Sequence, residues 1–429
     1  MLKSIYNQLW NRRKSNGWIL LELLLVFCLA WYIVDYFFVI GYNYSITSHQ
    51  DIDHTWQVNI RQFPSDHPGF KEEESTPEAI ENNYRRILNK IRNYPGVENV
   101  AINFNNSYPG SSGFWGSGFY NPNDSMSLIG VQRIIITSEE DYFSVFKNTV
   151  NNGEMHVSSN DFNWNLPNPI VLDRQTELLL FNGGSAKGQT VASPRDGIFH
   201  VAGVVDNVKR FPFGRIQTKV YLPVRLEASS ISGATISVRV DASLDEKQFF
   251  AKFRKDMISS LRVGNFYMTN IRSYSEITED QIISDGLVND IRIRFYILLF
   301  FLVNILLCMI GTFWYRIHIR REEIGLRIAL GSSRRGIRDL LINEGLLLLS
   351  VITLPAMIIE YQFVHADLID TFGKEARNQF GYLVDKTSLR FLITNLITWV
   401  VMAIVIALSI LLPAYKASIV MPAESLNHE

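Results

Sequence analysis

The residues with the densest potential for metal chemistry lie in one short segment of the chain. His49, Asp51, Asp53 and His54 offer two imidazoles and two carboxylates within a few positions. Metal sites collect ligands that converge from the fold, and adjacent residues of one segment rarely all point to a common centre. We therefore interpret the segment as a solvated linker and expect no metal ligands in this chain.

A second segment approaches the spacing of a phosphate-binding loop. In residues 182–190, Asn-Gly-Gly-Ser-Ala-Lys-Gly-Gln-Thr, Gly183 and Gly188 have the required separation, but Gln189 stands where a lysine must reach the phosphates. The sequence has no Gly-x-Ser-x-Gly or His-Glu-x-x-His motif and no Cys–His arrangement typical of hydrolases. We expect no catalytic residue and no cofactor bound by this chain, so any ATP chemistry belongs to another chain.

The elements around these segments include four long apolar stretches, one near the N-terminus and three in the last third of the chain. They cover residues 18–40, 295–315, 340–361 and 391–412. Each holds about 20 residues, which at 1.5 Å per residue is enough to cross a hydrocarbon core of roughly 30 Å. The pattern predicts an α-helical membrane protein with four transmembrane helices and a large external domain between the first and second helices.

Composition alone does not reveal this organisation. The net charge is −1 and the hydrophobic fraction is 47 %, both ordinary for a soluble protein. A charge balance near zero gives no support for a nucleic-acid partner. Cys28 and Cys308 both fall in apolar stretches, so the external domain has no thiol and no disulfide framework.

Basic residues predict the orientation in the membrane. The N-terminal segment carries Lys3, Arg12, Arg13 and Lys14 without an acidic residue, and the loop between the second and third stretches is rich in arginine. Lysine and arginine concentrate on the cytoplasmic side. Both termini are therefore expected in the cytoplasm, with residues 42–290 and the 362–390 loop on the outer side of the membrane.

The first apolar stretch is expected to remain as an uncleaved anchor, because it is longer than a signal-peptide core and no small-x-small site follows it. Glu22 and Asp35 lie within it towards opposite ends. A charge at the bilayer centre costs about 3 kcal/mol on insertion scales. We interpret both as carboxylates at headgroup level or facing the helix bundle, with a dedicated functional carboxylate as the alternative.

The external domain is predicted to be α+β, with two βαβ halves on either side of an insert. Residues 56–61 alternate as a half-buried strand, a helix opens near Ser75 and Glu78, and residues 97–104 return as a strand. The second half repeats this plan with a strand at 234–240, a helix opening at Ser243 and Glu246, and a strand at 265–271. Both helix starts have capping-box spacing. Two such halves can pair into one subdomain.

The insert contains short runs rich in valine and isoleucine, separated by Asn/Gly turns, and is predicted to be mostly β. Residues 105–124, rich in Gly and Ser with several aromatics, are expected to form a mobile loop, or alternatively a loop that contacts a substrate or partner.

The loop between the second and third stretches carries the most specific signal. Residues 320–350 read RREEIGLRIALGSSRRGIRDLLINEGLLLLS. Gly331 suits the C′ position of a short helix, and Ser332 or Ser333 suits the N-cap of the next. Arg334, Arg335 and Arg338 would then lie at the inner headgroup level as anchors. Apolar residues displayed on the short helix either lie in the headgroups or dock into a partner.

These residues resemble the FtsX/MacB-type ABC transporter permease family. The resemblance is carried by Glu323-Ile324-Gly325-Leu326-Arg327-x-Ala329-Leu330-Gly331 and by the closing segment at residues 413–426. In the external domain, residues 169–172, 188–191 and 201–205 are similar to the MacB-like periplasmic core. The resemblance spans about residues 18–429, without the ATPase domain that is fused in MacB itself.

The resemblance implies a domain plan. Residues 1–17 would be cytoplasmic, 18–41 the first transmembrane helix, and 42–290 a periplasmic MacB-like core, porter-like at about 55–130 and 234–275 with an inserted β-rich lobe at about 131–233. Residues 291–429 would be an FtsX-like permease domain. Its parts are a second span at 294–316, a coupling helix at 320–331, spans at 338–361 and 391–413, and a tail at 414–429. Segments 42–55 and 279–294 would extend the first two helices as a stalk.

The function implied by the resemblance is mechanotransmission by a non-catalytic subunit. A separate cytoplasmic ABC ATPase, which binds ATP and Mg, would dock on a coupling helix formed by Glu322, Glu323, Ile324, Gly325, Leu326, Arg327, Ala329, Leu330 and Gly331. A second permease subunit, identical or related, would complete the assembly in the lipid bilayer, with a periplasmic adaptor as a further candidate partner. The movement would drive export or extraction of an amphiphile such as a peptide, an antibiotic or a lipoprotein.

Two alternatives remain at this level. The chain could be an FtsX-like activator of a cell-wall hydrolase, or an ATP-independent envelope sensor whose external domain binds a ligand. Neither the substrate nor the choice between homodimer and heterodimer follows from the sequence.

Overall fold

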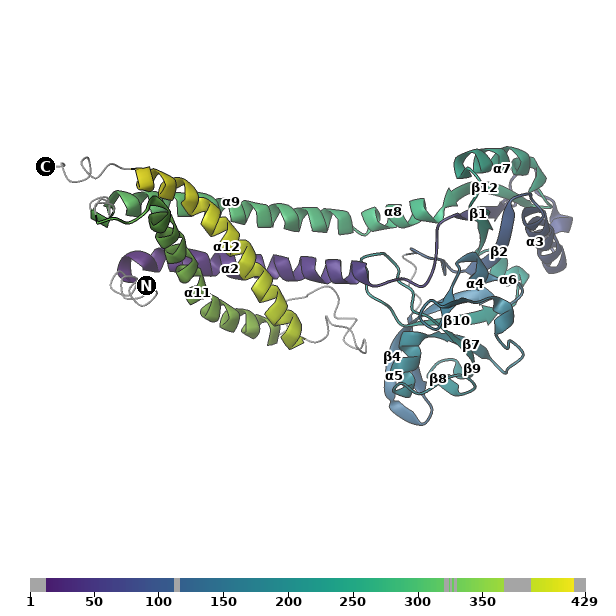
Figure 1. Cartoon of the computed structure of the whole chain (residues 1–429). Coiled ribbons are helices and arrows are strands. Elements are labelled where there is room, and N and C mark those ends of the chain that lie inside the picture. The colour runs from purple at the N-terminus through teal and green to yellow at the C-terminus, as the bar shows by residue number, and fades with distance from the viewer. Residues whose placement is uncertain are drawn as a thin grey trace. The chain divides into compact units, whose positions relative to one another are not determined.

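The computed structural model describes residues 13–111, 116–319, 324, 326–327, 330–365 and 387–419. The chain forms two compact units. The helical unit combines the N-terminal part up to Tyr42 with the part from Val288 onward, and the α/β unit runs from Asn43 to Leu287. The elements of each unit are labelled in Figure 1.

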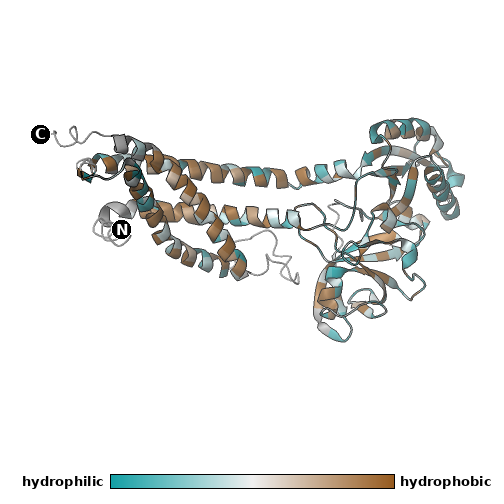
Figure 2. Ribbon diagram, in the orientation of Figure 1, coloured by the Kyte–Doolittle hydropathy of each residue, from teal (hydrophilic) through white to brown (hydrophobic). Residues whose placement is uncertain are grey.

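The helical unit contains the four long apolar helices that the sequence predicts. They are α2 (Arg13–Ser45), α9 (Leu287–Ile319), α11 (Arg334–His365) and α12 (Thr387–Ile419). Each holds a segment long and apolar enough to cross a bilayer. Figure 2 shows nearly continuous hydrophobic colouring along these helices, in contrast to the mixed colouring of the strands and helices of the α/β unit.

Helix α2 is the most enclosed of the four. Of its apolar 18-residue stretch, 56 % is buried, whereas 11 % of the corresponding stretch of α9 is buried. Phe27 of α2 packs in one core with Phe313 of α9, Leu349 of α11 and Ile406 of α12. Polar side chains also face this interior: the Trp31 indole donates to the Thr394 hydroxyl at 2.9 Å, and Asp35 binds Arg390. Asp35 is therefore one of the bundle-facing carboxylates that the sequence predicted.

The first part of the α/β unit is a four-stranded antiparallel sheet. Its order is β2-β11-β1-β12, from β1 (Thr55–Gln62), β2 (Val97–Phe104), β11 (Ala234–Val240) and β12 (Phe266–Ser273). The two βαβ halves are thus interleaved, with β11 between β1 and β2. Helices α3 (Pro77–Arg92) and α7 (Glu246–Ser260) bury their apolar residues against this sheet in one core.

The second part is a closed six-stranded barrel. Strand β10 (Lys219–Val224) pairs with β7 on one side and with β4 on the other, which closes the ring β10-β7-β9-β8-β3-β4. Its interior is apolar, with Phe119, Val191 and Val220 among the residues that have no exposed surface. The other strands are β3 (Gly116–Asn121), β4 (Asp124–Thr137), β7 (Pro169–Asp173), β8 (Thr190–Ser193) and β9 (Gly197–Val205).

The predicted lobe boundary at residue 131 is wrong, because β3 and the first half of β4 belong to the barrel. Strand β4 has 14 residues and serves both parts: it pairs with β3 and β10 in the barrel and with β2 at Asn103↔Ile136. Short elements complete the unit: α4 (Tyr142–Val145), β5 (Thr149–Val150), β6 (Met155–His156), α5 (Arg174–Phe181), α6 (Ala228–Ile231), α8 (Tyr274–Ser284), and the 3-10 turns Glu72–Ser75 and Ser159–Asp161.

Local details differ from the sequence predictions at the helix starts. Thr76, not Ser75, caps α3 by accepting the Ala79 amide at 3.2 Å, and Asp245, not Ser243, caps α7 by accepting the Gln248 amide at 3.1 Å. Each cap lies one or two residues later than the capping-box spacing indicates. Ser243 instead donates its own amide to Asp241.

The predicted loop and stalk are also modified. In the 105–124 segment, the Ser107 hydroxyl accepts the Ile135 amide and residues 116–121 form β3, so both flanks are packed; residues 112–115 lie outside the described part. Helix α2 ends at Ser45 and does not continue to residue 55. The second extension is interrupted between α8 and α9, where Gly286 has φ +73°, a value that suits glycine.

Candidate functional site

The predicted coupling helix ends at Gly331 as the sequence indicates. Gly331 has φ +95°, and the amide of Ser332 donates to the Arg327 carbonyl at 2.9 Å. This bond from the C″ residue to the C3 carbonyl is the 6→1 bond of a Schellman motif, which needs a left-handed residue at C′. The Leu330 amide also donates to the Leu326 carbonyl at 2.9 Å. The last turn of the short helix is therefore fixed in the described residues.

The apolar residues of this turn divide between the core and the surface. Ile324 is only 7 % exposed and packs in the core of the helical unit, whereas Leu326 is 53 % and Leu330 is 79 % exposed. Residues four positions apart lie on the same face of a helix. Leu326 and Leu330 therefore form a small exposed apolar face, which we call the leucine face, on a turn anchored by Ile324.

The next helix starts two residues after this turn. The Ser333 hydroxyl accepts the Gly336 amide at 3.1 Å, so Ser333, one of the two predicted candidates, is the N-cap of α11. Arg335 is exposed and Arg338 is half-buried at the start of α11. Glu322, Glu323, Gly325 and Ala329, and the side chain of Arg334, lie outside the described residues.

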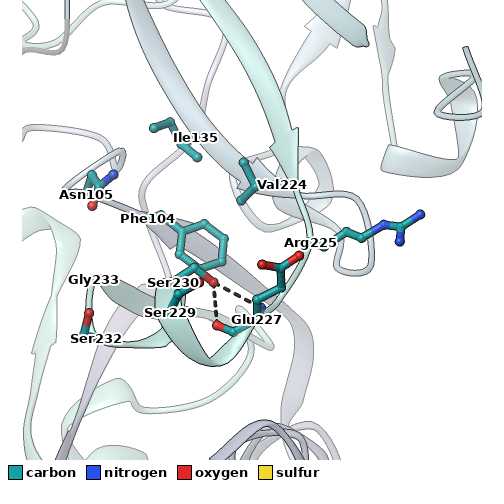
Figure 3. A pocket seen from close by; sticks show the side chains of 10 residues that line it. All are labelled: Phe104, Asn105, Ile135, Val224, Arg225, Glu227, Ser229, Ser230, Ser232 and Gly233. Atoms are coloured by element: carbon teal, nitrogen blue, oxygen red, sulfur yellow. Dashed lines mark hydrogen bonds between the residues drawn. The ribbon is translucent and has the colours of Figure 1, made fainter. Parts of the chain in front are cut away.

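The α/β unit contains a pocket of about 540 Å³ where the four-stranded sheet meets the barrel. Phe104 of β2, Ile135 of β4 and Val224 of β10 supply its apolar part. Figure 3 shows these side chains together with polar residues from the segment around α6. The polar lining consists of Asn105, Arg225, Glu227, Ser229, Ser230 and Ser232.

Two local features shape this pocket. The Ser230 hydroxyl donates to the Glu227 carbonyl at 2.8 Å and accepts the Glu227 amide at 3.2 Å, which closes the turn of α6 (Figure 3). Gly233 lies so close to Asn105 that an added Cβ would approach its Oδ1 to 2.8 Å. Among the residues that the structure describes, the lining contains hydroxyls and one carboxylate but no histidine or cysteine. The arrangement is suited to binding an amphiphilic group rather than to nucleophilic catalysis.

The segments first considered for metal and nucleotide chemistry have other partners. His54 binds Glu246 at 2.7 Å, and Asp51 lies 3.3 Å from Arg239. In the 182–190 loop the Ala186 amide donates to Glu177 and the Gly188 amide to the Val201 carbonyl, so these amides are not directed at a phosphate. Among the described residues no group of three or more His, Cys, Asp or Glu could hold a metal ion.

Comparisons with known proteins give matches to solved structures alone. No protein-family model and no curated protein matches the chain. The solved structures that are similar to it each cover about half of the chain. The periplasmic region of MacB from Actinobacillus actinomycetemcomitans matches at 13 % identity and a TM-score of 0.32, covering 54 % of this chain and 93 % of that one.

The extracellular domain of the noncanonical ABC-type transporter YknZ from Gram-positive bacteria matches at 16 % identity and a TM-score of 0.30, covering 50 % of this chain and 100 % of that one.

The pocket was not found from the sequence. Its lining comes from β2, β4, β10 and α6, which are far apart along the chain. The serine-rich run Ser229-Ser230 and Ser232 beside Gly233 was a visible polar turn, but nothing in the sequence placed it next to Phe104.

Proposed function

We propose that this chain is the membrane subunit of an ABC transporter of the MacB/FtsX type. A separate ATPase would bind on the cytoplasmic side, and its ATP-driven movement would be passed through the helices to the α/β unit. The observation that carries the proposal is the leucine face, held between α9 and α11 by a glycine-capped turn. Exposed leucines beside arginines form a surface that a protein partner can desolvate.

The outer pocket supports the substrate class. Its apolar part, with Phe104, Ile135 and Val224, suits a hydrocarbon or aromatic group, and its rim of hydroxyls with Arg225 and Glu227 suits a polar group. We propose an amphiphilic substrate, such as a peptide, an antibiotic or a lipoprotein, that is exported or extracted from the outer side of a bacterial cell membrane. A second permease subunit would complete the assembly.

The test uses the full chain together with candidate ABC ATPases that lack membrane helices, starting with any that is encoded beside its gene. Leu326→Asp and Leu330→Asp should weaken ATPase binding and its stimulation at least tenfold, because a carboxylate would have to be desolvated in the contact. Leu326→Met and Leu330→Met keep the apolar volume and should stay within twofold of the unsubstituted chain. If both aspartate variants bind and stimulate the ATPase normally, the leucine face is not the coupling surface.

A further inference from the structure

A five-residue segment of the α/β unit, Asp206–Arg210, binds the ends of two helices that lead into the helical unit. The segment follows β9 directly, so it starts from the wall of the barrel. Asp206 is 5 %, Val208 1 % and Lys209 3 % exposed. It is therefore a buried connection and not a surface loop. We call it the 206–210 segment.

Lys209 holds the end of α2. Its ammonium donates to the carbonyl of Asn43 at 2.5 Å, to the carbonyl of Ile46, and to the carbonyl of Pro212 at 3.1 Å. The first two belong to the last turn of α2 and the residue after it, where the helix supplies few partners for its carbonyls. The Asn43 carbonyl accepts the Ile46 amide at 3.1 Å in addition to the Lys209 ammonium. A cation also interacts favourably with the negative end of the helix dipole. Lys209 is thus a C-terminal cap supplied from more than 160 residues away.

Arg210 holds the end of α8. Its guanidinium donates to the Asp285 carboxylate at 3.0 Å, and Asp285 is the C-cap residue of α8 immediately before the Gly286 break. Asp285 also accepts the Gln281 side-chain amide at 2.7 Å and donates its own amide to the Gln281 carbonyl. The pair is therefore tied to the last turn of α8.

The chain that leaves α2 is bound to the same segment by its backbone. The His49 amide donates to the Asn207 carbonyl at 3.1 Å, and the Lys209 amide donates to the Ser48 hydroxyl at 3.1 Å. The Gln50 side chain donates to the Lys209 carbonyl at 3.0 Å. Residues 48–50 consequently follow any displacement of the segment.

On its other side the 206–210 segment is bound to the six-stranded barrel and to the short elements between β4 and β7, which together we call the barrel lobe. Asp206 accepts the Thr149 hydroxyl at 2.8 Å and the amides of Asn152 and Gly153 at 3.0 and 2.8 Å. The Asn207 side chain accepts the Gln175 amide at the start of α5 at 2.7 Å. A segment bonded to its surroundings this densely moves as part of the lobe.

We propose that the 206–210 segment transmits displacement of the helix ends to the barrel lobe, with Lys209 holding α2 and Arg210 holding α8. The inference rests on the proposed function, because it assigns the route of a movement that the ATPase would drive. Lys209 and Arg210 act here as positioning residues. A displaced helix end either carries the lobe with it or breaks hydrogen bonds to charged groups, which are among the stronger ones in proteins.

Burial opposes the charge of Lys209 and lowers its pKa to about 8. The ammonium form nevertheless supplies three donors for three carbonyls, which a neutral amine cannot do. Replacement by methionine keeps the length of the side chain and removes all three hydrogen bonds.

The experiment uses the full chain with its ATPase in lipid nanodiscs, with Cys28 and Cys308 replaced by alanine. Spin labels at Lys187→Cys on the barrel and Lys255→Cys on α7, both exposed, report the distance between barrel and sheet with and without ATP and vanadate. With the 206–210 segment unsubstituted, the distance between the two labels should shift when nucleotide is added. K209M and R210D should each reduce this shift at least fourfold, while ATPase binding stays within twofold.

Charge reversal provides the control for a merely structural effect. D285R should restore the shift in R210D by re-forming the pair in reverse, whereas R174Q, which removes an exposed arginine paired with Glu177 in the same lobe, should leave the shift unchanged. The inference is overturned if K209M and R210D keep the full shift, or if D285R does not rescue R210D. The charge-reversal pair decides the matter even if K209M fails to fold.

A second measurement separates this inference from the proposed function. Hydrogen exchange of the full chain, without ATPase, should show the amides of residues 45–50 exchanging at least tenfold faster in K209M than in R174Q. If the unsubstituted chain does not bind an ATPase, the proposed function fails. The exchange data then still decide whether the segment holds the end of α2, and equal rates would contradict that.

Discussion

Arg390 of α12 donates through Nε to Asp35 of α2 at 2.8 Å, and a second guanidinium nitrogen binds the other carboxylate oxygen. Asp35 is 2 % and Arg390 9 % exposed, within the helical unit. One turn away on α2, the Trp31 indole donates to Thr394. The first and fourth long helices are therefore joined by a two-bond charge pair and a neutral hydrogen bond along one seam.

This pair predicts an asymmetric response to substitution. Asp35→Asn leaves the Arg390 guanidinium buried without a counter-charge, which should lower the stability of the full chain by about 3–5 kcal/mol. Removing both charges as Asp35→Leu with Arg390→Met should be much milder, because no charge remains buried. The temperature at which half of the detergent-solubilised protein is no longer monodisperse measures the stability of the single and the double variant. Equal losses for the single and the double variant would contradict a buried pair.

The proposed orientation predicts the accessibility of the turn after the leucine face. In a chain with Cys28 and Cys308 replaced by alanine, Ser332→Cys should react with a membrane-impermeant maleimide in inside-out vesicles and not in intact cells. Lys187→Cys, in the α/β unit, should give the opposite result. Ser332 is exposed in the structure, so burial of the side chain cannot explain protection of Ser332→Cys from the maleimide in intact cells. Labelling of Ser332→Cys in intact cells would reverse the topology and remove the basis of the coupling proposal.

Two glycines close together predict different effects of alanine on ATPase stimulation. Gly331 has φ +95°, where an L-residue costs about 1–2 kcal/mol, so Gly331→Ala should loosen the leucine-face turn and reduce ATPase stimulation several-fold. Gly336 lies inside the first turn of α11, where alanine is favoured by up to about 1 kcal/mol. Gly336→Ala should leave stimulation unchanged. Steady-state ATPase rates of the reconstituted complex check this, and equal effects of the two variants would show that the left-handed cap is irrelevant.

Most features encoded by local pattern were predicted from the sequence, apart from the N-caps of α3 and α7. The long helices follow from about 20 consecutive apolar residues. The strands and helices of the two βαβ halves follow from alternating residues such as Trp56, Val58 and Ile60 next to helices with an apolar stripe. The interleaving of the two halves was not predicted. The Gly331 cap and the Ser333 N-cap were also local, since each depends on residues within one turn.

Features that depend on pairing between distant segments were not predictable. Closure of the barrel requires the parallel pairing Lys219↔Gln132, and the alternation of hydrophobic residues in β4 and β10 does not specify a partner. The helix cap by Lys209 has the same character: a single lysine in a β-rich region reads as a surface residue until the fold brings it to Asn43. The pocket beside Phe104 needs four elements at once.

Asp141 predicts a pH-dependent contribution to the stability of the α/β unit. Burial alone would raise its pKa, but hydrogen bonds from Ser144, Ser158 and Ser159 to the carboxylate outweigh burial and hold the pKa below its usual value. The donors are the Ser144 amide at 3.0 Å and hydroxyl at 2.5 Å, the Ser158 hydroxyl at 2.7 Å, and the Ser159 amide at 2.9 Å. A pKa that is lower in the folded than in the unfolded state adds stability at pH values above the unfolded pKa of about 4. That stability is lost as the pH falls through the pKa of the folded state.

Asp141→Asn should therefore lower the free energy of unfolding by about 2 kcal/mol at pH 7 and flatten the dependence of that free energy on pH below 4. Trp164, whose indole donates to the Ser159 carbonyl at 2.7 Å, reports unfolding next to the site by fluorescence in guanidinium titrations. Asp245→Asn is the matched control: Asp245 caps α7 through the Gln248 amide, asparagine caps helices equally well, and the change should cost less than about 0.5 kcal/mol. An unaltered pH profile in Asp141→Asn would show that these hydrogen bonds do not stabilise the carboxylate over its protonated form.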